Sequence, residues 1–424
     1  MLASFSTYAS KIMGKALFII ELKFPLINAI NIKMTNLKDK KADIILMDNN
    51  VDMRQIARNL ENLEIFENVY LGNDINIGEA IKESLKRRKN IISSSLVEFR
   101  RIRNTLWGQF NEQTFVKKCI IDGRNIDLDE YDEIYVKNDN RLTDACLRYL
   151  IKNSRINKIN IIEEGINSYC NEKQSKVFFR YLDNLVLWVY SKELFVFDYR
   201  KYTIKDINKL KSDDITFKSI LNYIFGYLGF EKDIHKNSII YFEQVSEPLP
   251  DYLVNISAVK KFLLYNSYQK ACKENRLYVE KCKTIDTIEK TLRKHLDKLR
   301  FYIKLHPRTI HGLPEKYKNY IWENNQISNI PWELYYLNNP EIESMWITNA
   351  SGAVTNPLYC FENTSKLRIG LTYRLDEQYR YYLNPNLDKF YQKLTSQYHC
   401  LNIYNSYGEL QEDILFYMRK TTYL

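Results

Sequence analysis

Short apolar runs alternate along this chain with longer segments of helical periodicity, and this alternation predicts layered α/β structure. In the first half of the chain, segments typical of buried strands are found at 15–24, 42–48, 118–122, 132–137 and 158–163. Helices are expected between them at 25–34, where Pro25 suits a first helical turn, and at 144–152.

The same pattern starts again at 238–244. It predicts helices at 251–274 and 286–299, followed by strands at 300–305, 344–349 and 366–373. The polar segment 230–237 separates the two halves, and 424 residues exceed what one hydrophobic core usually serves. We therefore predict two Rossmann-like domains, residues 1–235 and 236–424, that face each other across a cleft.

Composition narrows the class of protein further. Hydrophobic residues make up 45% of the chain, enough for two cores, and the net charge of +10 favours an anionic partner such as a nucleotide sugar, a phospholipid surface or nucleic acid. The seven cysteines form no CxxC pair, which argues against a disulfide framework or a zinc site and favours a reducing cytoplasm. No apolar run reaches the ~18 residues of a membrane span, and residues 1–12 are interpreted either as an extension before the first strand or as a misassigned start.

Because ligands bind beyond the carboxyl ends of parallel strands, the residues that follow each strand are the first candidates for chemistry. The strand at 158–163 ends on Glu163, Glu164 and Gly165. Repulsion between adjacent carboxylates in a partly desolvated turn makes one of them a better general base, and the glycine permits a tight turn. The alternative is an acidic turn that caps the next segment, and two acids and a glycine alone favour that alternative.

A second strand end carries cationic and imidazole groups. The strand at 300–305 contains Lys304 and runs into His306, Pro307 and Arg308. Lys304 and His306 are two residues apart, so they project to the same side of a strand, where together they suit a phosphate. A structural role for His306 is the alternative, and for the histidine considered by itself it is the safer interpretation.

A third candidate combines an acid with a small-residue turn. Glu333 follows Pro331 and Trp332, and the strand at 344–349 runs into Ser351 and Gly352. A strand that ends in small residues at a helix start offers backbone N–H groups and a hydroxyl to an anion. An ordinary helix N-cap is the alternative interpretation, and both can hold at once.

In this order, the acidic-acidic-glycine turn, the later His-Pro pair and the serine turn resemble the bacterial sialyltransferases. They are most similar to glycosyltransferase family 52, the lipooligosaccharide sialyltransferases, with kinship to the bacterial polysialyltransferases. Segments 17–30 and 330–333 also resemble elements of that family. The resemblance implies a GT-B-like fold and inverting transfer of sialic acid from CMP-sialic acid to a terminal sugar, with galactose expected, of a bacterial surface glycan. It implies no cofactor and no metal.

Carried over to this chain, the resemblance implies a role for each candidate. Glu163 is the expected base that deprotonates the acceptor hydroxyl, with Glu164 and Asp286 as alternatives. His306 is expected to protonate or stabilise the leaving phosphate of CMP. The residues expected to bind the nucleotide are Lys304, Pro307, Glu333, Ser351 and Gly352. Gly352 departs from the family pattern, which usually has a second Ser or Thr there.

The densest basic segment is Lys86, Arg87, Arg88 and Lys89, followed by three arginines at 100–103. It is either a solvated helix face or a surface that docks on anionic lipid or a phosphorylated glycolipid acceptor. Nucleic acid is not expected, because no zinc finger, helix-turn-helix or aromatic RNP signature is present. We expect a cytoplasmic protein, peripheral at the inner face of the plasma membrane, and a possible homodimer by analogy with the family.

Two other functions stay open from the residues. One is a GT-B transferase for a different nucleotide sugar, which normally needs contacts for a diphosphate. The other is a non-catalytic glycan-binding protein descended from such an enzyme. The single Asp-x-Asp, at 127–129, lies in an acidic loop and is interpreted as a solvated turn rather than a metal site.

Overall fold

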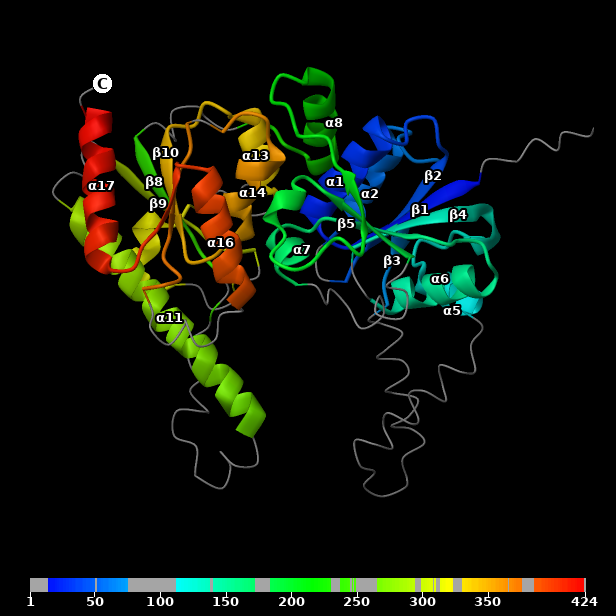
Figure 1. Cartoon of the computed structure of the whole chain (residues 1–424), viewed down its shortest axis with the longest axis horizontal. Coiled ribbons are helices and arrows are strands. Elements are labelled where there is room, and N and C mark those ends of the chain that lie inside the picture. Colours follow the sequence, from blue (N-terminus) through cyan, green and yellow to red (C-terminus); the bar gives the residue numbers. More distant parts are fainter. Residues whose placement is uncertain are drawn as a thin grey trace, which may run out of the picture. The chain divides into compact units, whose positions relative to one another are not determined.

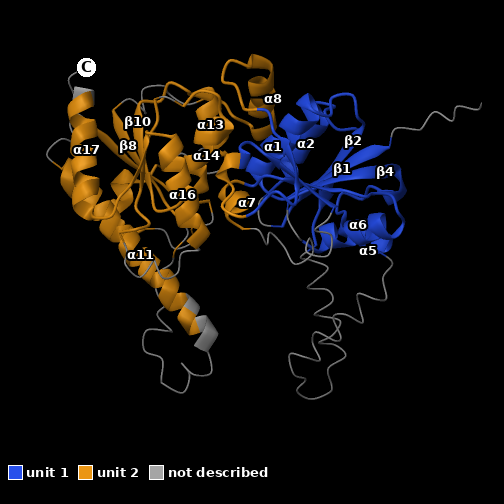
Figure 2. Cartoon of the chain, viewed as in Figure 1, with its two compact units in different colours: residues 1–164, 172–192, 198–208 blue, residues 165–171, 193–197, 209–424 orange. Residues whose placement is uncertain are grey.

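The computed structural model describes residues 14–49, 52–74, 112–137, 140–171, 184–229, 237–244, 246, 248, 265–293, 299–307, 309, 313–322, 330–364, 366–375 and 385–422. The chain divides into two compact units (Figure 2). Unit 1 comprises Met1–Glu164, Glu172–Lys192 and Asp198–Asn208, and unit 2 comprises Gly165–Asn171, Glu193–Phe197 and Lys209–Leu424. The basic segment at 86–89 and the arginines at 100–103 lie outside the described residues.

Unit 1 is built on a seven-stranded parallel sheet in the order β3-β2-β1-β4-β5-β6-β7. The strands are β1 (Lys15–Ile20), β2 (Ala42–Met47), β3 (Asn68–Gly72), β4 (Tyr131–Val136), β5 (Ile159–Ile162), β6 (Leu185–Val189) and β7 (Thr203–Asp206). Its helices are α1 (Lys23–Thr35), α2 (Arg54–Glu61), α5 (Glu112–Cys119) and α6 (Arg141–Lys152), with a short 3₁₀ turn η1 (Leu128–Glu130). Strand order reverses between β1 and β4, as in a doubly wound Rossmann fold.

Unit 2 has a five-stranded parallel sheet in the order β12-β11-β10-β8-β9. The strands are β8 (Ser238–Phe242), β9 (Arg300–Lys304), β10 (Ser344–Thr348), β11 (Arg368–Leu371) and β12 (Leu401–Ile403). The helices are α7 (Ile166–Cys170), α8 (Ile215–Phe225), α11 (Tyr265–Leu292), α13 (Trp332–Asn338), α14 (Gly352–Cys360), α16 (Pro385–Gln397) and α17 (Tyr407–Thr422), with η5 (Glu315–Tyr320). Two of them, α11 and α17, pack side by side (Figure 1).

Both sheets are covered on their two faces, which explains the nearly continuous apolar strands. All six residues of β2 are buried, as are all five of β8 and of β10. In unit 1, Phe18 stacks on Tyr135 with ring centroids 4.5 Å apart. In unit 2, Trp346 meets Trp332 edge to face at 5.3 Å. Two parallel α/β units in one chain confirm the predicted class, α/β with two Rossmann-like domains as in GT-B-like proteins.

The compact units divide earlier in the sequence than the expected boundary at 235/236. Unit 1 ends at Asn208, and α8 belongs to unit 2. The reason is local packing: the side chains of Asn222 on α8 and Asn338 on α13 exchange two hydrogen bonds of 2.9 and 2.7 Å. Most of the polar segment 230–237, which carried the sequence-based boundary, lies outside the described residues.

Two element predictions were wrong. The strand expected at 118–122 is instead the end of α5, in which Phe115, Val116 and Cys119 are buried at helical spacing, while Ile120 makes a single antiparallel bridge. The two helices expected at 251–274 and 286–299 are one helix from Tyr265 to Leu292, with 251–264 outside the described residues. A short apolar run does not distinguish strand from helix end, and a long helix with a polar outer face looks interrupted in sequence. None of the described helices is sufficiently long and apolar to span a bilayer.

Candidate active site

The strand order of unit 2 locates a ligand site within that unit. As in a doubly wound sheet, the strands that follow β8 are added on one side (β9) and then on the other (β10, β11 and β12), so the order reverses between β8 and β10. In such sheets, ligands bind outside the carboxyl ends of the strands at this point. Glu243 follows β8, His306 lies two residues beyond Lys304 at the end of β9, and Ser351 follows β10. Residues that the sequence singled out thus lie at this edge of the sheet.

Lys304 and Glu333 are two buried charged residues that interact electrostatically. Glu333, in the first turn of α13, is 3% exposed, and its Oε1 accepts a 2.7 Å hydrogen bond from Nδ2 of Asn356. Burial raises the pKa of Glu333 above its ordinary value, while its own backbone N–H, the Asn356 amide and the charge of Lys304 act in the opposite direction. Because the charge of Lys304 acts on Glu333, these two predicted nucleotide-binding residues lie near each other.

The serine turn begins α14. Ser351 is its N-cap residue, and the Ser351 N–H donates to the Thr348 hydroxyl at 3.3 Å. Within the described part of the chain, the Ser351 side chain makes no capping hydrogen bond to the helix. The Tyr391 hydroxyl donates to the carbonyl of Ala350 at 3.0 Å and thereby fixes the turn from the side of α16. A hydroxyl on a fixed turn at a helix start is the arrangement expected of a phosphate contact.

Asn356 links several of these elements, and the sequence reasoning missed it. Besides donating to Glu333, its Oδ1 accepts from the Tyr359 hydroxyl at 2.6 Å. Gly165 starts α7 with φ 102° and ψ −147°, and a Cβ added there would lie 3.1 Å from Oδ1 of Asn356. A Cβ added at Gly352 would lie 3.5 Å from the same atom. A buried asparagine in the apolar helix 352–360 was the sequence signal that could have revealed it.

His306 is half-buried, and its backbone is held from both sides. Its N–H donates to Oε2 of Glu243 at 3.1 Å, and its carbonyl accepts from Thr309 N–H at 3.0 Å. Pro307, expected to help bind the nucleotide, is exposed in this turn. The sequence predicts a strand at 238–244 that includes Glu243, whereas β8 ends at Phe242 and Glu243 is the first residue beyond it.

The two adjacent acids lie at the carboxyl edge of the unit 1 sheet in different environments. Glu163 is 1% exposed, and its Oε2 accepts from the Tyr190 N–H at 2.9 Å. Asn28 supports this strand end by donating to the Glu163 carbonyl at 2.9 Å and accepting from the Tyr190 hydroxyl at 2.8 Å. The Glu164 side chain is 22% exposed and forms an ion pair with Lys137.

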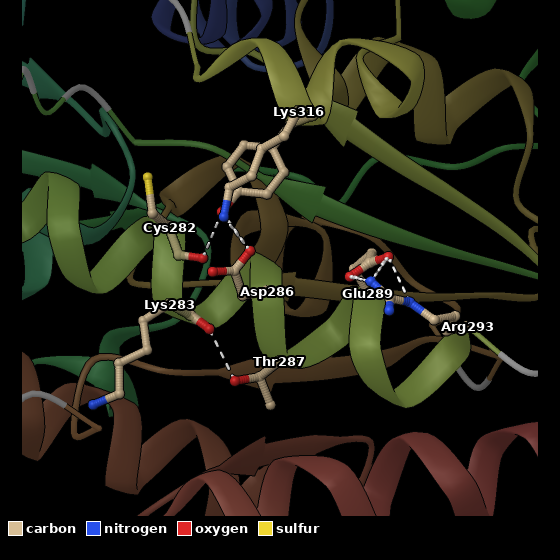
Figure 3. Close-up of polar contacts among 8 residues, drawn as sticks. Cys282, Lys283, Asp286, Thr287, Glu289, Arg293 and Lys316 are labelled. Carbon is tan, nitrogen blue, oxygen red and sulfur yellow. Dashed lines mark hydrogen bonds and ion pairs between the residues drawn. The ribbon is translucent and has the colours of Figure 1, made fainter.

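Asp286, the alternative base, lies on α11, and its carboxylate is hydrogen-bonded to residues of η5 (Figure 3). Its Oδ1 accepts from Lys316 Nζ at 2.6 Å and from the Tyr317 hydroxyl at 2.7 Å. Partial burial raises the pKa of Asp286, but the hydrogen bonds and charge of its two partners outweigh that effect and lower the pKa below its ordinary value. The α11 residue that reaches the end of β8 is Lys281, not Asp286.

The other acidic feature, the Asp-x-Asp turn, has a local structural use. The Asp127 side chain accepts from the backbone N–H of Asp129 and caps η1, and it also accepts from Gln113 at 3.1 Å. Asp129 accepts from the Tyr149 hydroxyl at 3.1 Å. Both acids therefore tie a turn to its neighbouring helices.

No family model matches the chain, and no curated protein matches it in sequence. Among solved structures, it is similar to an α/β-galactoside α-2,3-sialyltransferase from Photobacterium phosphoreum, with 10% identity over 92% of this chain and 98% of that one and a TM-score of 0.45. It is also similar to Arabidopsis thaliana UGT89C1 complexed with UDP (10%, 96% and 94%, TM-score 0.45). A third is a putative UDP-N-acetylglucosamine 2-epimerase from Listeria monocytogenes (10%, 90% and 88%, TM-score 0.42). At these values the likenesses assign neither an activity nor a residue role to this chain.

Proposed function

We propose that this chain is an inverting glycosyltransferase that moves sialic acid from CMP-sialic acid to a sugar hydroxyl of a bacterial surface glycan. The observation that carries the proposal is the grouping at the carboxyl edge of unit 2, where Lys304, His306 and the Ser351 turn lie at the ends of β9 and β10. A cation, an imidazole and a helix start suit one phosphate group that leaves with negative charge.

The chemistry needs two kinds of group. The acceptor hydroxyl loses its proton to a carboxylate as its oxygen bonds to the anomeric carbon through an oxocarbenium-like state. The bond from that carbon to the phosphate oxygen breaks, and CMP leaves with the electron pair. In the proposal, Lys304 stabilises the charge on the phosphate and His306 donates a hydrogen bond or a proton to it.

The environments of the two adjacent acids favour Glu164 as the base. Glu163 is buried and its carboxylate holds the backbone of Tyr190, whereas Glu164 keeps 22% of its side chain exposed beside Lys137. Replacing Glu164 with Gln is expected to lower kcat by a factor of about 10² to 10⁴, the usual range for general base catalysis. Glu163→Gln serves as the matched comparison. A larger loss of kcat in Glu163→Gln at unchanged stability would assign the base to Glu163.

The donor is tested by transfer and by binding. Purified protein is incubated with CMP-sialic acid or with UDP-sugars and a panel of labelled disaccharides, and thermal shift is measured with CMP and with UDP. We expect sialylated product and stabilisation by CMP. Stabilisation by UDP alone would contradict the sialyl donor and favour a transferase for another nucleotide sugar. Binding of glycans without product from any donor would favour the non-catalytic alternative.

The role of His306 is tested by replacement with Ala. Transfer is expected to fall while circular dichroism and the melting temperature stay near those of the wild type, because the ring is only half-buried. The control is His399→Ala, since His399 is an exposed histidine in the turn before β12. Equal rates for the two variants would remove His306 from the mechanism.

The basic segment Lys86, Arg87, Arg88 and Lys89 is proposed to dock the enzyme on anionic lipid, at about 1 kcal/mol per basic residue near the surface. Reversing these four charges is expected to release the protein from vesicles that contain anionic phospholipid. If the charge-reversed protein still binds those vesicles, the segment 86–89 is not the membrane-docking surface.

A further inference from the structure

Glu243 is a buried carboxylate at the end of β8, directly beside the turn that carries His306. Three side-chain or backbone donors converge on it. Its Oε2 accepts from the His306 N–H at 3.1 Å and from the Thr309 hydroxyl at 2.7 Å, and its Oε1 accepts from Lys281 Nζ at 2.5 Å. The carboxylate is therefore filled by protein donors on both oxygens.

These bonds extend the strand pairing past the end of β9. The main-chain pairing of β8 and β9 ends where Glu243 N–H donates to the Lys304 carbonyl at 3.0 Å. Beyond that point the Glu243 carboxylate, instead of a backbone carbonyl, accepts the hydrogen bond from the His306 N–H. Because Pro307 has no N–H, the following anchor is the Thr309 side chain, and the turn is closed by Thr309 N–H on the His306 carbonyl.

Lys281 makes the burial of this carboxylate possible. Both side chains are almost completely inaccessible, and Lys281 Nζ also donates to the Ser246 carbonyl at 3.1 Å. A buried charge without a partner is strongly destabilising, so the lysine and the carboxylate require each other. Glu243 is thus committed to two structural partners, α11 through Lys281 and the His306 turn through its second oxygen.

We propose that Glu243 is a positioning residue that fixes the backbone of the His306 turn, so that the imidazole meets the leaving phosphate in one orientation. The inference rests on the proposed function, because it assigns Glu243 no contact with substrate and acts only through His306. A catalytic group that is misplaced by about 1 Å can lose on the order of 100-fold in rate. The effect of Glu243 is therefore expected in kcat and not in the affinity for CMP.

The experiment compares two double variants that differ in one feature. Glu243→Gln/Lys281→Met removes both buried charges but keeps an amide oxygen that can accept the His306 N–H. Glu243→Met/Lys281→Met has the same chain length and charge but no acceptor. We expect the Gln variant to keep kcat for sialyl transfer within about threefold of wild type and the Met variant to lose about 10- to 100-fold, with donor KM similar in both.

A coupling measurement distinguishes positioning from general damage. In a His306→Ala background, the Gln and Met double variants are expected to have the same residual rate, because Glu243 acts through the missing ring. A tenfold difference that persists without His306 would overturn the positioning role. Equal kcat for the Gln and Met variants, with His306→Ala strongly slowed, would also overturn it while leaving the proposed function intact. An unchanged rate for His306→Ala would instead contradict the proposed function itself.

Thr309→Val provides a second test that keeps the buried ion pair. It removes one of the two donors on Oε2 of Glu243 and preserves side-chain shape, so folding does not depend on a redesigned pair. We expect a smaller loss of kcat, about three- to tenfold, at unchanged donor KM, since the His306 N–H keeps its acceptor. A rise in KM with kcat unchanged would place Thr309 in substrate binding and contradict the inference.

Discussion

Gly165 offers the sharpest single-residue test of the candidate site. Its φ of 102° and ψ of −147° belong to a region of backbone conformation that is accessible essentially to glycine alone. An alanine Cβ at this position would also lie 3.1 Å from Oδ1 and 3.3 Å from Nδ2 of Asn356. Gly165→Ala therefore combines backbone strain with a close steric contact to Asn356, the residue that donates a hydrogen bond to Glu333.

The expected magnitude follows from these two contributions. Holding a non-glycine residue in such a conformation costs about 1–3 kcal/mol. Asn356 cannot move away easily, because it is bonded to Glu333 at 2.7 Å and to Tyr359 at 2.6 Å, and distorting one of these buried hydrogen bonds costs about 1 kcal/mol more. We expect the free energy of unfolding of unit 2 to fall by about 2–4 kcal/mol. Each kcal/mol lowers the melting temperature of a unit of this size by roughly 2–4 °C.

The matched control is Gly226→Ala in the same unit. Gly226 ends α8 with φ 64° and ψ 36°, and no atom of the described structure lies within 4 Å of a Cβ added there. Its left-handed conformation costs an alanine about 1 kcal/mol, without any steric contact. Urea and thermal unfolding of both variants, with and without CMP, measure the difference. Equal destabilisation of the two variants would refute the proposed steric contact between the alanine Cβ and Asn356.

Three further outcomes follow from the contacts described. Because burial raises the pKa of Glu333 above that of an ordinary glutamate, its contribution to stability is present below the ordinary pKa and lost as pH rises, so Glu333→Gln should gain melting temperature relative to wild type as the pH rises above that ordinary pKa; a pH-independent difference would contradict this. Asp286→Asn should cost under about 1 kcal/mol, since that side chain is 34% exposed, and should leave sialyl transfer within twofold; a loss above 100-fold would make Asp286 the base. Tyr190→Phe should cost about 1–3 kcal/mol by leaving buried Asn28 Oδ1 without its 2.8 Å donor, measured by urea unfolding; a neutral change would show that the amide finds another partner.

The sequence predicted most of the fold because buried parallel strands have a distinctive pattern. The runs at β1, β2, β8 and β10 are apolar at almost every position, so their locations followed directly. The edge strand β7, in contrast, has no buried residue in its TIKD sequence, and β12 has only three residues. β7 is exposed and β12 is short, so neither carries a periodic signal, and pairing with a neighbour defines them.

The sequence indicates the candidate residues of the site but not the residues that support them. The sequence named Lys304, His306 and Glu333 as candidates because they lie at or near predicted strands, whereas Lys281 contacts Glu243 from the middle of a long helix. Such a contact joins segments 38 residues apart and depends on the rotation of α11 about its axis. A single sequence gives the polar and apolar faces of a helix, but not which of its lysines reaches a strand end.

Burial distinguishes Glu164 from three other acids at strand ends or a helix start. Glu163, Glu243 and Glu333 are all nearly inaccessible, and each accepts a hydrogen bond from a residue of a neighbouring element: Tyr190 N–H, His306 N–H and the Asn356 amide. Each bonded oxygen stabilises local geometry, and using that oxygen as a base would require breaking its hydrogen bond. Glu164 alone among these four keeps an accessible part of its carboxylate, and its ion-pair partner Lys137 lies at the end of the adjacent strand. A proton acceptor must come within hydrogen-bond distance of the acceptor hydroxyl, so its greater accessibility is the reason for proposing Glu164 as the base.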